Sequence, residues 1–292
     1  MPYLLKAYDD ALKVILEDGE WRTNARTGLR TKAVFGMQCR YRLDHGFPLL
    51  TRRKVWPKSI FAELLWFISG STNVKDLEAL GSKIWNPWRS EEFEKKHRYV
   101  EGALGPVYGF NLRHFGGWYG DGNREIQPRH QYGEGGFDQL AYMMERLKTD
   151  PTDRRIMFSL WNPAALDKMR LPPCHFTYQV MVDDAGRLTG ILTQRSCDFP
   201  IGVPANIQFY SALTMMLAQQ AGFTAYEFVH NTNDSHIYEN QIDAVRAYLD
   251  TPVIDSPSLL LNKAPDVYSY RMEDFQLQDF RSGPKIDIPV AV

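Results

Sequence analysis

The sequence predicts a single mixed α+β domain. Helical spacing of apolar residues and strand-like alternation both occur along the chain, and a short turn joins two strand-like runs. No repeat, low-complexity tract or Pro/Ser-rich linker divides the 292 residues. We therefore expect residues 1–292 to form one domain in which helices pack on a sheet.

The first seventy residues predict two helices and a strand between them. Apolar residues recur at helical spacing over residues 4–16 and Gly19 follows as a stop, which favours an amphipathic helix. Alternation predicts a strand with one face formed by Ala33, Phe35, Met37 and Cys39. Residues 58–70, "KSIFAELLWFISG", are apolar nearly all round apart from Glu63, which is typical of a buried helix. Glu63 then has either a structural partner or a raised pKa that suits proton relay.

The rest of the chain predicts a loop, a further helix, a strand, a hairpin and a central helix. Residues 114–136 are rich in glycine and polar residues and predict a loop insertion, and residues 137–147 resume helical spacing. Residues 154–161, "RRIMFSLW", resemble a strand, and "FTYQVMV" and "RLTGILTQRS" predict a hairpin. Residues 206–222 predict a nearly all-apolar helix. Asn206 is there a natural N-cap, or an amide that recognises a pyrimidine edge.

Composition excludes several classes of protein. The formal charge of -1 and pI near 6.7 argue against a nucleic-acid binder, so any phosphate site must be local. Three scattered cysteines fit a reducing compartment, the first residues lack the features of a secretory signal, and no apolar run approaches ~18 residues. We expect a cytoplasmic protein with no membrane span.

Cys174 is the candidate nucleophile. A lone cysteine is most often a small buried hydrophobe. Cys174, however, follows Pro172 and Pro173, which fix the local backbone, and it begins a strand, so its sulfur can face a cleft. A nearby cation favours the reactive thiolate, and the hairpin returns Arg195 to the start of the same strand pair.

Several other polar residues are candidates for ligand binding. Arginines next to turns, strands or glycines suit a phosphate monoester, although the sequence does not show that they converge; they are Arg26, Arg154, Arg155, and Arg195 with Ser196. His236 and Tyr238 are two apart on an extended segment and point the same way, toward a ligand hydroxyl. His230, Asp234 and His236 match no established metal-ligand spacing, so we expect no metal. Dinucleotide and nucleoside-triphosphate motifs do not occur.

Ten short motifs in register resemble one known family. They are "RTG" at 26–28, "ELLWFISGSTN" at 63–73, "IWNPW" at 84–88, "LGPVYGF" at 104–110, "DRRI" at 153–156, "LPPCH" at 171–175, "QRSCD" at 194–198, "GVPAN" at 202–206, "DSHIY" at 234–238 and the final "PVAV". This pattern resembles the thymidylate synthase and deoxynucleotide hydroxymethylase family. The resemblance implies a mixed or antiparallel twisted sheet packed by helices, with one sheet face forming a homodimer interface.

The resemblance also implies residue roles. Cys174 would be the nucleophile that adds to C6 of dUMP, with Glu63 and Tyr108 managing protons and Arg195 beside the thiol. Asn206 would choose uracil, and His236 and Tyr238 would hold the 3'-hydroxyl. The phosphate would be held by Arg26, Arg195 and Ser196, together with Arg154 and Arg155 from the other subunit.

The implied cosubstrate is 5,10-methylenetetrahydrofolate, with no metal. Asp198 would hold the pterin ring of the folate. The other residues implied for this cosubstrate are Trp56, Trp85, Gly202, Ala205, Ala291 and Val292.

Three departures from the family pattern leave alternatives open. Ala205 replaces the usual phenylalanine, "TND" at 232–234 replaces a glycine-bearing turn, and Leu112 replaces a common tryptophan. The favoured reaction is methylation of dUMP to dTMP with release of dihydrofolate, and the alternative is 5-hydroxymethylation, in which water replaces the hydride. Asn206 argues against the cytidylate hydroxymethylases, which carry aspartate at the matching position. A nucleotide- or messenger-RNA-binding regulator is disfavoured because it would need no nucleophile.

Overall fold

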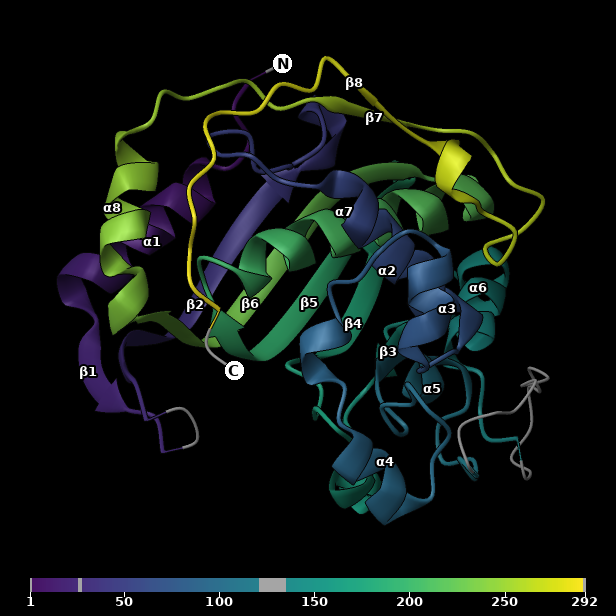
Figure 1. Cartoon of the computed structure of the whole chain (residues 1–292). Helices are drawn as coiled ribbons and strands as arrows, with labels where there is room; N and C mark the ends of the chain where they lie inside the picture. The colour runs from purple at the N-terminus through teal and green to yellow at the C-terminus, as the bar shows by residue number, and fades with distance from the viewer. Residues whose placement is uncertain (1, 26–27, 121–134, 291–292) are drawn as a thin grey trace.

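A six-stranded sheet forms the centre of the protein (Figure 1). The computed structural model describes residues 2–25, 28–120 and 135–290. Strand order in the sheet is β1-β2-β6-β5-β4-β3, and β7 and β8 form a separate pair. The strands are β1 Glu20–Thr23, β2 Arg30–Arg42, β3 Met157–Ser159, β4 His175–Val182, β5 Arg187–Asp198, β6 Thr224–Tyr238, β7 Ser258–Leu261 and β8 Phe275–Gln278.

The sheet is mixed because of one crossover. β5 and β6 run parallel, whereas the pairs β1–β2, β2–β6, β3–β4 and β4–β5 are antiparallel. Parallel neighbours need a long connection, and helix α7 supplies it between β5 and β6. The carboxyl end of β5 therefore lies beside that of β6, with Ser196 opposite Asp234 and Asp198 opposite His236.

The described part of the chain also forms eight α-helices, and α2 and α7 lie in front of the sheet in Figure 1. The helices are α1 Lys6–Asp18, α2 Pro57–Ser69, α3 Val74–Ala79, α4 Glu91–His97, α5 Tyr108–Arg113, α6 Gln139–Thr149, α7 Gly202–Ala221 and α8 Ile242–Asp250. Short 3-10 helices are η1 Leu43–His45, η2 Asn86–Trp88, η3 Pro163–Lys168, η4 Glu239–Gln241 and η5 Met272–Asp274. No helix in the described residues is long and apolar enough to cross a bilayer.

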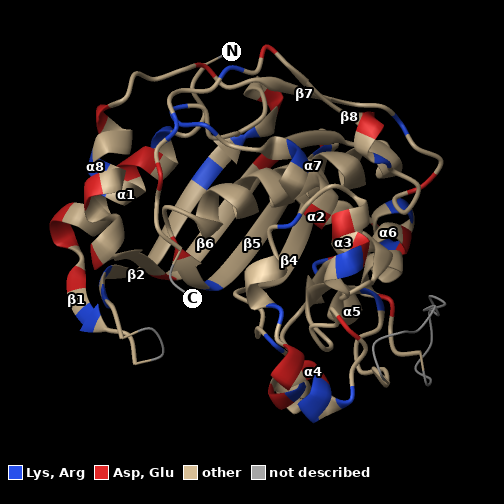
Figure 2. Cartoon of the chain, viewed as in Figure 1, with Lys and Arg blue, Asp and Glu red and all other residues tan. Residues whose placement is uncertain are grey.

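Helix α7 is the central buried helix, as predicted, but it begins earlier than expected. It carries no charged side chain over its 20 residues and is uncoloured in Figure 2. It starts at Gly202, so Pro204 lies in its first turn, where a missing N–H costs little. Asn206 is thus inside the helix, and its assignment as the N-cap was wrong. Gly222 ends the helix with a left-handed φ of 83°, as the sequence predicted.

The other predicted elements are confirmed in part. α1, α2, α6 and the β4–β5 hairpin occur where apolar spacing placed them. The strand predicted at residues 154–161 shrinks to Met157–Ser159, which leaves Arg154 and Arg155 in the preceding turn. Phe35, predicted to share one face of its strand with Ala33 and Cys39, is 61% exposed although both of those residues are buried, and the pairing of β2 with β6 keeps one register past Gly36. Residues 121–134 of the predicted loop insertion lie outside the described residues.

Aromatic packing between α2 and α5 positions the side chain of Tyr108. Phe67 of α2 stacks on Tyr108 at the start of α5, with ring centroids 4.8 Å apart, and also contacts Phe209 of α7 at 5.1 Å. Gly109 lets the two helices approach, since a Cβ there would lie 2.7 Å from the carbonyl oxygen of Ser71. Tyr108 is therefore held rigidly in the core.

A buried ion pair joins α5 to α6. Arg113 Nε donates to Asp138 Oδ2 at 2.9 Å, and both side chains are almost fully buried. Asp138 also caps α6, because its Oδ1 accepts the backbone N–H of Ala141 at 3.0 Å.

We predict that Asp138→Ala lowers the free energy of unfolding by about 3 to 5 kcal/mol, since it leaves a buried guanidinium without its carboxylate and removes a helix cap. The matched control is Asp150→Ala at the other end of α6, where the ion pair with Arg146 is exposed and worth at most about 1 kcal/mol. Urea denaturation measures both. Equal losses in the two variants would contradict the structural role of the buried pair.

Candidate active site

Cys174 is held by its backbone at the start of β4. Its N–H donates to the hydroxyl oxygen of Tyr108 at 2.8 Å, and its carbonyl accepts the backbone N–H of Arg195 at 2.8 Å. The guanidinium of Arg195 donates through Nε to the carbonyl of Pro173 at 2.8 Å and through Nη2 to that of Pro172 at 3.0 Å. The two prolines thus provide the acceptors that fix Arg195 beside Cys174. The predicted convergence of Cys174 and Arg195 is present.

The cation next to Cys174 is Arg195 and not the adjacent histidine. His175 is buried against Tyr108, with ring centroids 4.5 Å apart, and its Nδ1 lies 2.7 Å from the hydroxyl of Tyr210. Burial lowers the pKa of His175 to about 3, so its ring is neutral near pH 7. The guanidinium of Arg195 lies over the ring of Trp161, 5.0 Å from its centroid.

Glu63 is half-buried in helix α2, as the apolar pattern around it predicted. Trp85 donates its indole N–H to Oε1 of Glu63. Burial raises the pKa of Glu63 to about 7, and the hydrogen bond from Trp85 opposes this shift without cancelling it. Trp85 also packs edge-on against Tyr108 with centroids 5.6 Å apart. A carboxyl that gains and loses its proton near neutrality therefore lies behind Tyr108.

The amide of Asn206 has a fixed orientation. Gln194 Nε2 donates to the carbonyl of Ser196 at 3.0 Å, and since that carbonyl is only an acceptor, Oε1 of Gln194 must face the other way. This Oε1 accepts Nδ2 of Asn206 at 2.8 Å and lies 2.9 Å from Nε2 of His230. Burial lowers the pKa of His230 to about 3, so His230 is a neutral donor. Asn206 is left with its carbonyl oxygen and one N–H to offer a ligand.

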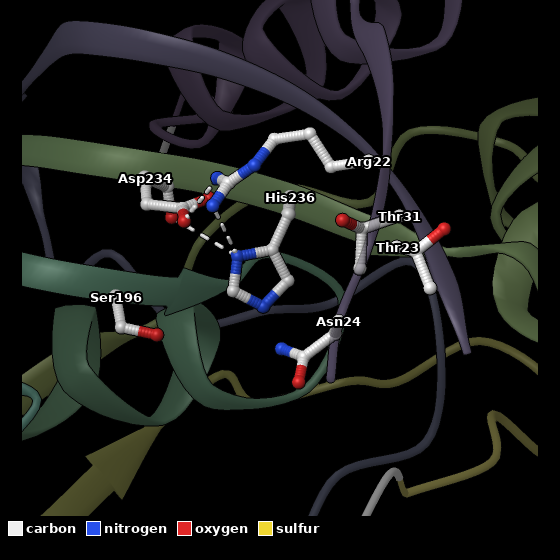
Figure 3. A pocket seen from close by; sticks show the side chains of 7 residues that line it. All are labelled: Arg22, Thr23, Asn24, Thr31, Ser196, Asp234 and His236. Atoms are coloured by element: carbon white, nitrogen blue, oxygen red, sulfur yellow. Dashed lines mark hydrogen bonds and ion pairs between the residues drawn. The ribbon is translucent and has the colours of Figure 1, made fainter. Parts of the chain in front are cut away.

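A polar pocket opens where β1, β2, β5 and β6 meet (Figure 3). It is lined by Arg22, Thr23, Asn24, Thr31, Ser196, Asp234 and His236. Asp234 accepts Arg22 Nη1 at 2.6 Å and His236 Nδ1 at 3.1 Å, and Figure 3 shows both contacts. Burial alone would raise the pKa of Asp234, but the hydrogen bonds from His236 and Arg22 lower it overall. Asp234 orients the His236 ring so that Nε2 points into the pocket.

Asp198 lies at the end of β5, next to the beginning of α7. Burial raises the pKa of Asp198 to about 6, although His236 and the amide of Gln241 oppose the shift. Gln241 Nε2 donates weakly to both carboxylate oxygens, at 3.3 and 3.4 Å. Asp198 therefore lies beside the polar pocket, because it pairs with His236 in the sheet.

The comparison with known proteins assigns this arrangement to a family. The family model described as "Thymidylate synthase" matches residues 6–292, nearly the whole chain. The chain belongs to this family. Its members are folate-dependent enzymes that bind dUMP and transfer a one-carbon unit to it from methylenetetrahydrofolate.

The remaining residues that the family resemblance singled out are spread around this site. Tyr238 is buried and packs edge-on against His236, with ring centroids 5.2 Å apart. Gly202 and Ala205 lie half-exposed in the first turns of α7, and Trp56 is 58% exposed just before α2. Arg26, Ala291 and Val292 lie outside the described residues.

Arg154 and Arg155 are not brought to Cys174 within this chain. Both are exposed in the turn before β3, which is the edge strand of the sheet. Arg155 Nε donates to Asp153 at 2.8 Å, and this contact lowers the pKa of Asp153 to about 2. Their position leaves both guanidinium groups accessible at the molecular surface.

Sequence patterns did not single out Gln194, Gln241 or Arg22. They also gave no sign that His230 is a partner of Gln194. The roles of these residues depend on contacts between distant segments, and glutamine has no distinctive sequence signal. Within residues 2–25, 28–120 and 135–290, no group of three or more metal-ligating side chains is close enough to hold an ion.

We predict that Glu63 makes the folded state less stable as the pH rises from about 4.5 to about 7. A carboxyl whose pKa is raised in the folded state binds its proton there after the unfolded chain has lost it, so unfolding is favoured progressively over this window. Relative to Glu63→Gln, the free energy of unfolding of the unmodified protein should fall by about 2 to 3 kcal/mol between about pH 5 and about pH 8. Urea denaturation at both pH values measures this difference, and a constant difference would contradict the raised pKa.

Proposed function

We propose that this protein transfers a one-carbon unit from 5,10-methylenetetrahydrofolate to C5 of dUMP and reduces it to a methyl group, giving dTMP and dihydrofolate. The observation that carries the proposal is the set around Cys174. The backbone N–H of Cys174 donates to the hydroxyl oxygen of Tyr108, and its backbone carbonyl accepts the N–H of Arg195. Glu63 lies behind Tyr108, on the far side of Trp85. This is the arrangement that nucleophilic activation of a pyrimidine needs.

The thiolate of Cys174 forms a bond to C6 of the uracil ring. The electron pair of the C5–C6 double bond moves toward C4 and O4, and C5 becomes nucleophilic enough to accept the one-carbon unit, which the folate supplies together with the hydride. Arg195 stabilises the thiolate, and Glu63 exchanges a proton at the O4 side because its pKa is about 7. Once the one-carbon unit is attached, C5 must lose its original proton, and the hydroxyl of Tyr108, whose oxygen accepts the N–H of Cys174, relays this proton away from C5. Expulsion of Cys174 restores the double bond.

The fixed amide of Asn206 supports uracil as the base. Uracil presents a donor at N3 and an acceptor at O4, which match the carbonyl oxygen and the second N–H of Asn206. Cytosine presents the reverse pattern, and an Asn206 amide flipped to suit it would turn its oxygen toward Oε1 of Gln194. The site thus discriminates against cytosine, because binding it would leave the carbonyl oxygens of Asn206 and Gln194 facing each other without a donor.

The polar pocket supports binding of a deoxyribose phosphate. Ser196 and the remaining guanidinium edge of Arg195 suit the phosphate with Arg26, and Nε2 of His236 together with Tyr238 suits the 3'-hydroxyl. Arg154 and Arg155 would complete the phosphate site of a second subunit in a homodimer. Support for this comes from the sheet face opposite α7, where the polar pairs Arg40–Glu227 and Gln38–Asn231 are at the surface.

The residues near Asp198 fit a folate. A buried carboxyl at the start of α7 is an acceptor for the N–H groups of a pterin, while Trp56 offers an exposed aromatic face. Gly202 and Ala205 leave room beside it. Trp85, together with Ala291 and Val292 at the chain end, would cover the ring and keep water away.

Hydroxymethylation of dUMP is the second candidate, and Ala205 favours it. The side chain is half-exposed in the first turns of α7 and is much smaller than the phenylalanine usual in the family. A missing aromatic wall costs about 1 to 3 kcal/mol of packing and gives water access to the methylene carbon.

Three readouts test the proposal together. We predict that the protein incubated with dUMP and methylenetetrahydrofolate gives a rise in near-ultraviolet absorbance from dihydrofolate, release of tritium from dUMP labelled at C5, and a product with the mass of dTMP. Tritium release with a hydroxymethyl product and no absorbance change would establish the second candidate instead.

Cys174→Ser should retain dUMP binding and lose turnover by at least about a thousandfold, because a hydroxyl is a far weaker nucleophile. Normal turnover in this variant would exclude the covalent route.

We also predict that Gln194→Leu relaxes base selection. Without its Oε1, the Asn206 amide is free to flip, and the ratio of dUMP to dCMP affinity should fall by about tenfold, the value of one hydrogen bond. Gln219→Leu is the control, since that amide donates to the carbonyl of Leu261, outside the site. Binding titrations with both nucleotides measure the ratio. An unchanged ratio in a folded Gln194→Leu protein would refute the orienting role of Gln194.

A further inference from the structure

We propose that Gln241 is a positioning residue that fastens the C-terminal segment to Asp198 and so closes the folate end of the site. This inference rests on the proposed function, because it takes Asp198 as a folate-binding residue. It assigns a role to a side chain that neither the sequence patterns nor the family resemblance singled out. Gln241 is fully buried at the end of η4, directly before α8.

The orientation of the Gln241 amide is unambiguous. The backbone N–H of Tyr238 donates to Oε1 at 3.0 Å, and since an N–H is only a donor, the oxygen of the amide must face it. Nε2 therefore faces the other side, where it donates to the carbonyl of Pro289 at 2.9 Å and to the carboxylate of Asp198 at 3.3 and 3.4 Å. One NH₂ group thus serves two acceptors.

Those two acceptors come from segments that would otherwise repel each other. The carbonyl oxygen of Pro289 and the carboxylate of the half-buried Asp198 both carry negative charge density and face the same buried amide, so they repel each other. The two hydrogens of Nε2 lie between them and offset this repulsion. Gln241 is neutral at every ordinary pH, so this link persists whether or not Asp198 is ionised.

The path of the C-terminal segment makes Gln241 the second of two attachment points. The segment is first fixed at Gly283, whose N–H donates to the carbonyl of Thr51 at 2.7 Å, and the next residue, Pro284, accepts the N–H of Lys54 at 2.9 Å. A Cβ at Gly283 would lie 2.2 Å from the carbonyl oxygen of Arg52, so only glycine fits. The chain then runs past α8 to the carboxyl ends of β5 and β6 (Figure 1), where Pro289 reaches Gln241.

Half of the residues between these two points are exposed, and none is fully buried. Lys285 and Asp287 point to solvent, and Ile286 makes partial contact with the core. Few buried contacts hold this stretch, so release at Pro289 would free the segment from residue 285 onward. Fastening by Gln241 therefore decides how often the folate end of the site is covered.

The decisive variant is Gln241→Glu. It keeps the size of the side chain and an acceptor for Tyr238, but when ionised it has no donor for Pro289 and adds a negative charge next to Asp198. Gln241→Met is the second variant; it keeps the volume without either charge or donor. Gln220→Leu is the matched control, because this amide also donates to a backbone carbonyl, that of Ala264, about 21 Å along α7 from Asn206.

Trypsin cleavage after Lys285, followed by mass spectrometry of the released peptide, measures fastening without any substrate. We expect cleavage to be faster by about fivefold or more in both Gln241 variants and unchanged in Gln220→Leu, because the cost of one lost hydrogen bond raises the open population by about that factor. Equal cleavage rates in either folded Gln241 variant and the unmodified protein would overturn the proposal.

Steady-state kinetics measures the consequence for the reaction. We expect the KM for methylenetetrahydrofolate to rise about tenfold, the hydroxymethyl fraction of the product to rise, and dUMP binding without folate to stay within about twofold. A general loss of structure would weaken dUMP binding as well, and that result would also overturn the positioning role. If the unmodified protein forms neither product, the proposed function fails, whereas the trypsin result still decides whether Gln241 holds the segment.

Discussion

The contact on which the rest of the site depends is that between the guanidinium of Arg195 and the carbonyl oxygens of Pro172 and Pro173. Proline cannot donate a hydrogen bond, so its carbonyl is the group through which this turn can be tied to β5. The contact places a permanent positive charge beside Cys174. Next to Arg195 in β5, Gln194 is buried and Ser196 lines the polar pocket.

Burial then divides the polar groups of the site into two kinds. Glu63 and Asp198 have pKa values raised to about 7 and about 6, so both change protonation near neutral pH. The amides of Gln194, Asn206 and Gln241 do not titrate, and their orientation is set by neighbours that can only donate or only accept. The groups that titrate near neutral pH are thereby separate from the amides that contact the base and the C-terminal segment. A change of pH that alters the first set leaves the second in place.

The sequence predicted those parts of the protein that depend on nearby residues. Apolar spacing located α1, α2 and α6, and the β4–β5 turn was sufficient to bring Arg195 back to Cys174. Alternation placed Phe35 on one face with Ala33 and Cys39, but it does not show how far the core extends along that face, and Phe35 is 61% exposed. The start of α7 was misplaced because Gly202 and Pro204 resemble a connecting turn. Gln194 and Gln241 escaped notice since each joins segments far apart in the chain.

The choice between a methyl and a hydroxymethyl product reduces to the access of water to one carbon atom. Two features of this chain act on that access in opposite directions. Ala205 removes an aromatic wall near the folate end, whereas Gln241 holds the C-terminal segment across the same end. A wall worth about 1 to 3 kcal/mol corresponds to a factor of about 5 to 150 in the partition between hydride and water. A segment that is closed in all but a small fraction of molecules excludes water by a comparable factor. Closure by Gln241 can therefore offset the small side chain of Ala205, and methyl formation remains compatible with both.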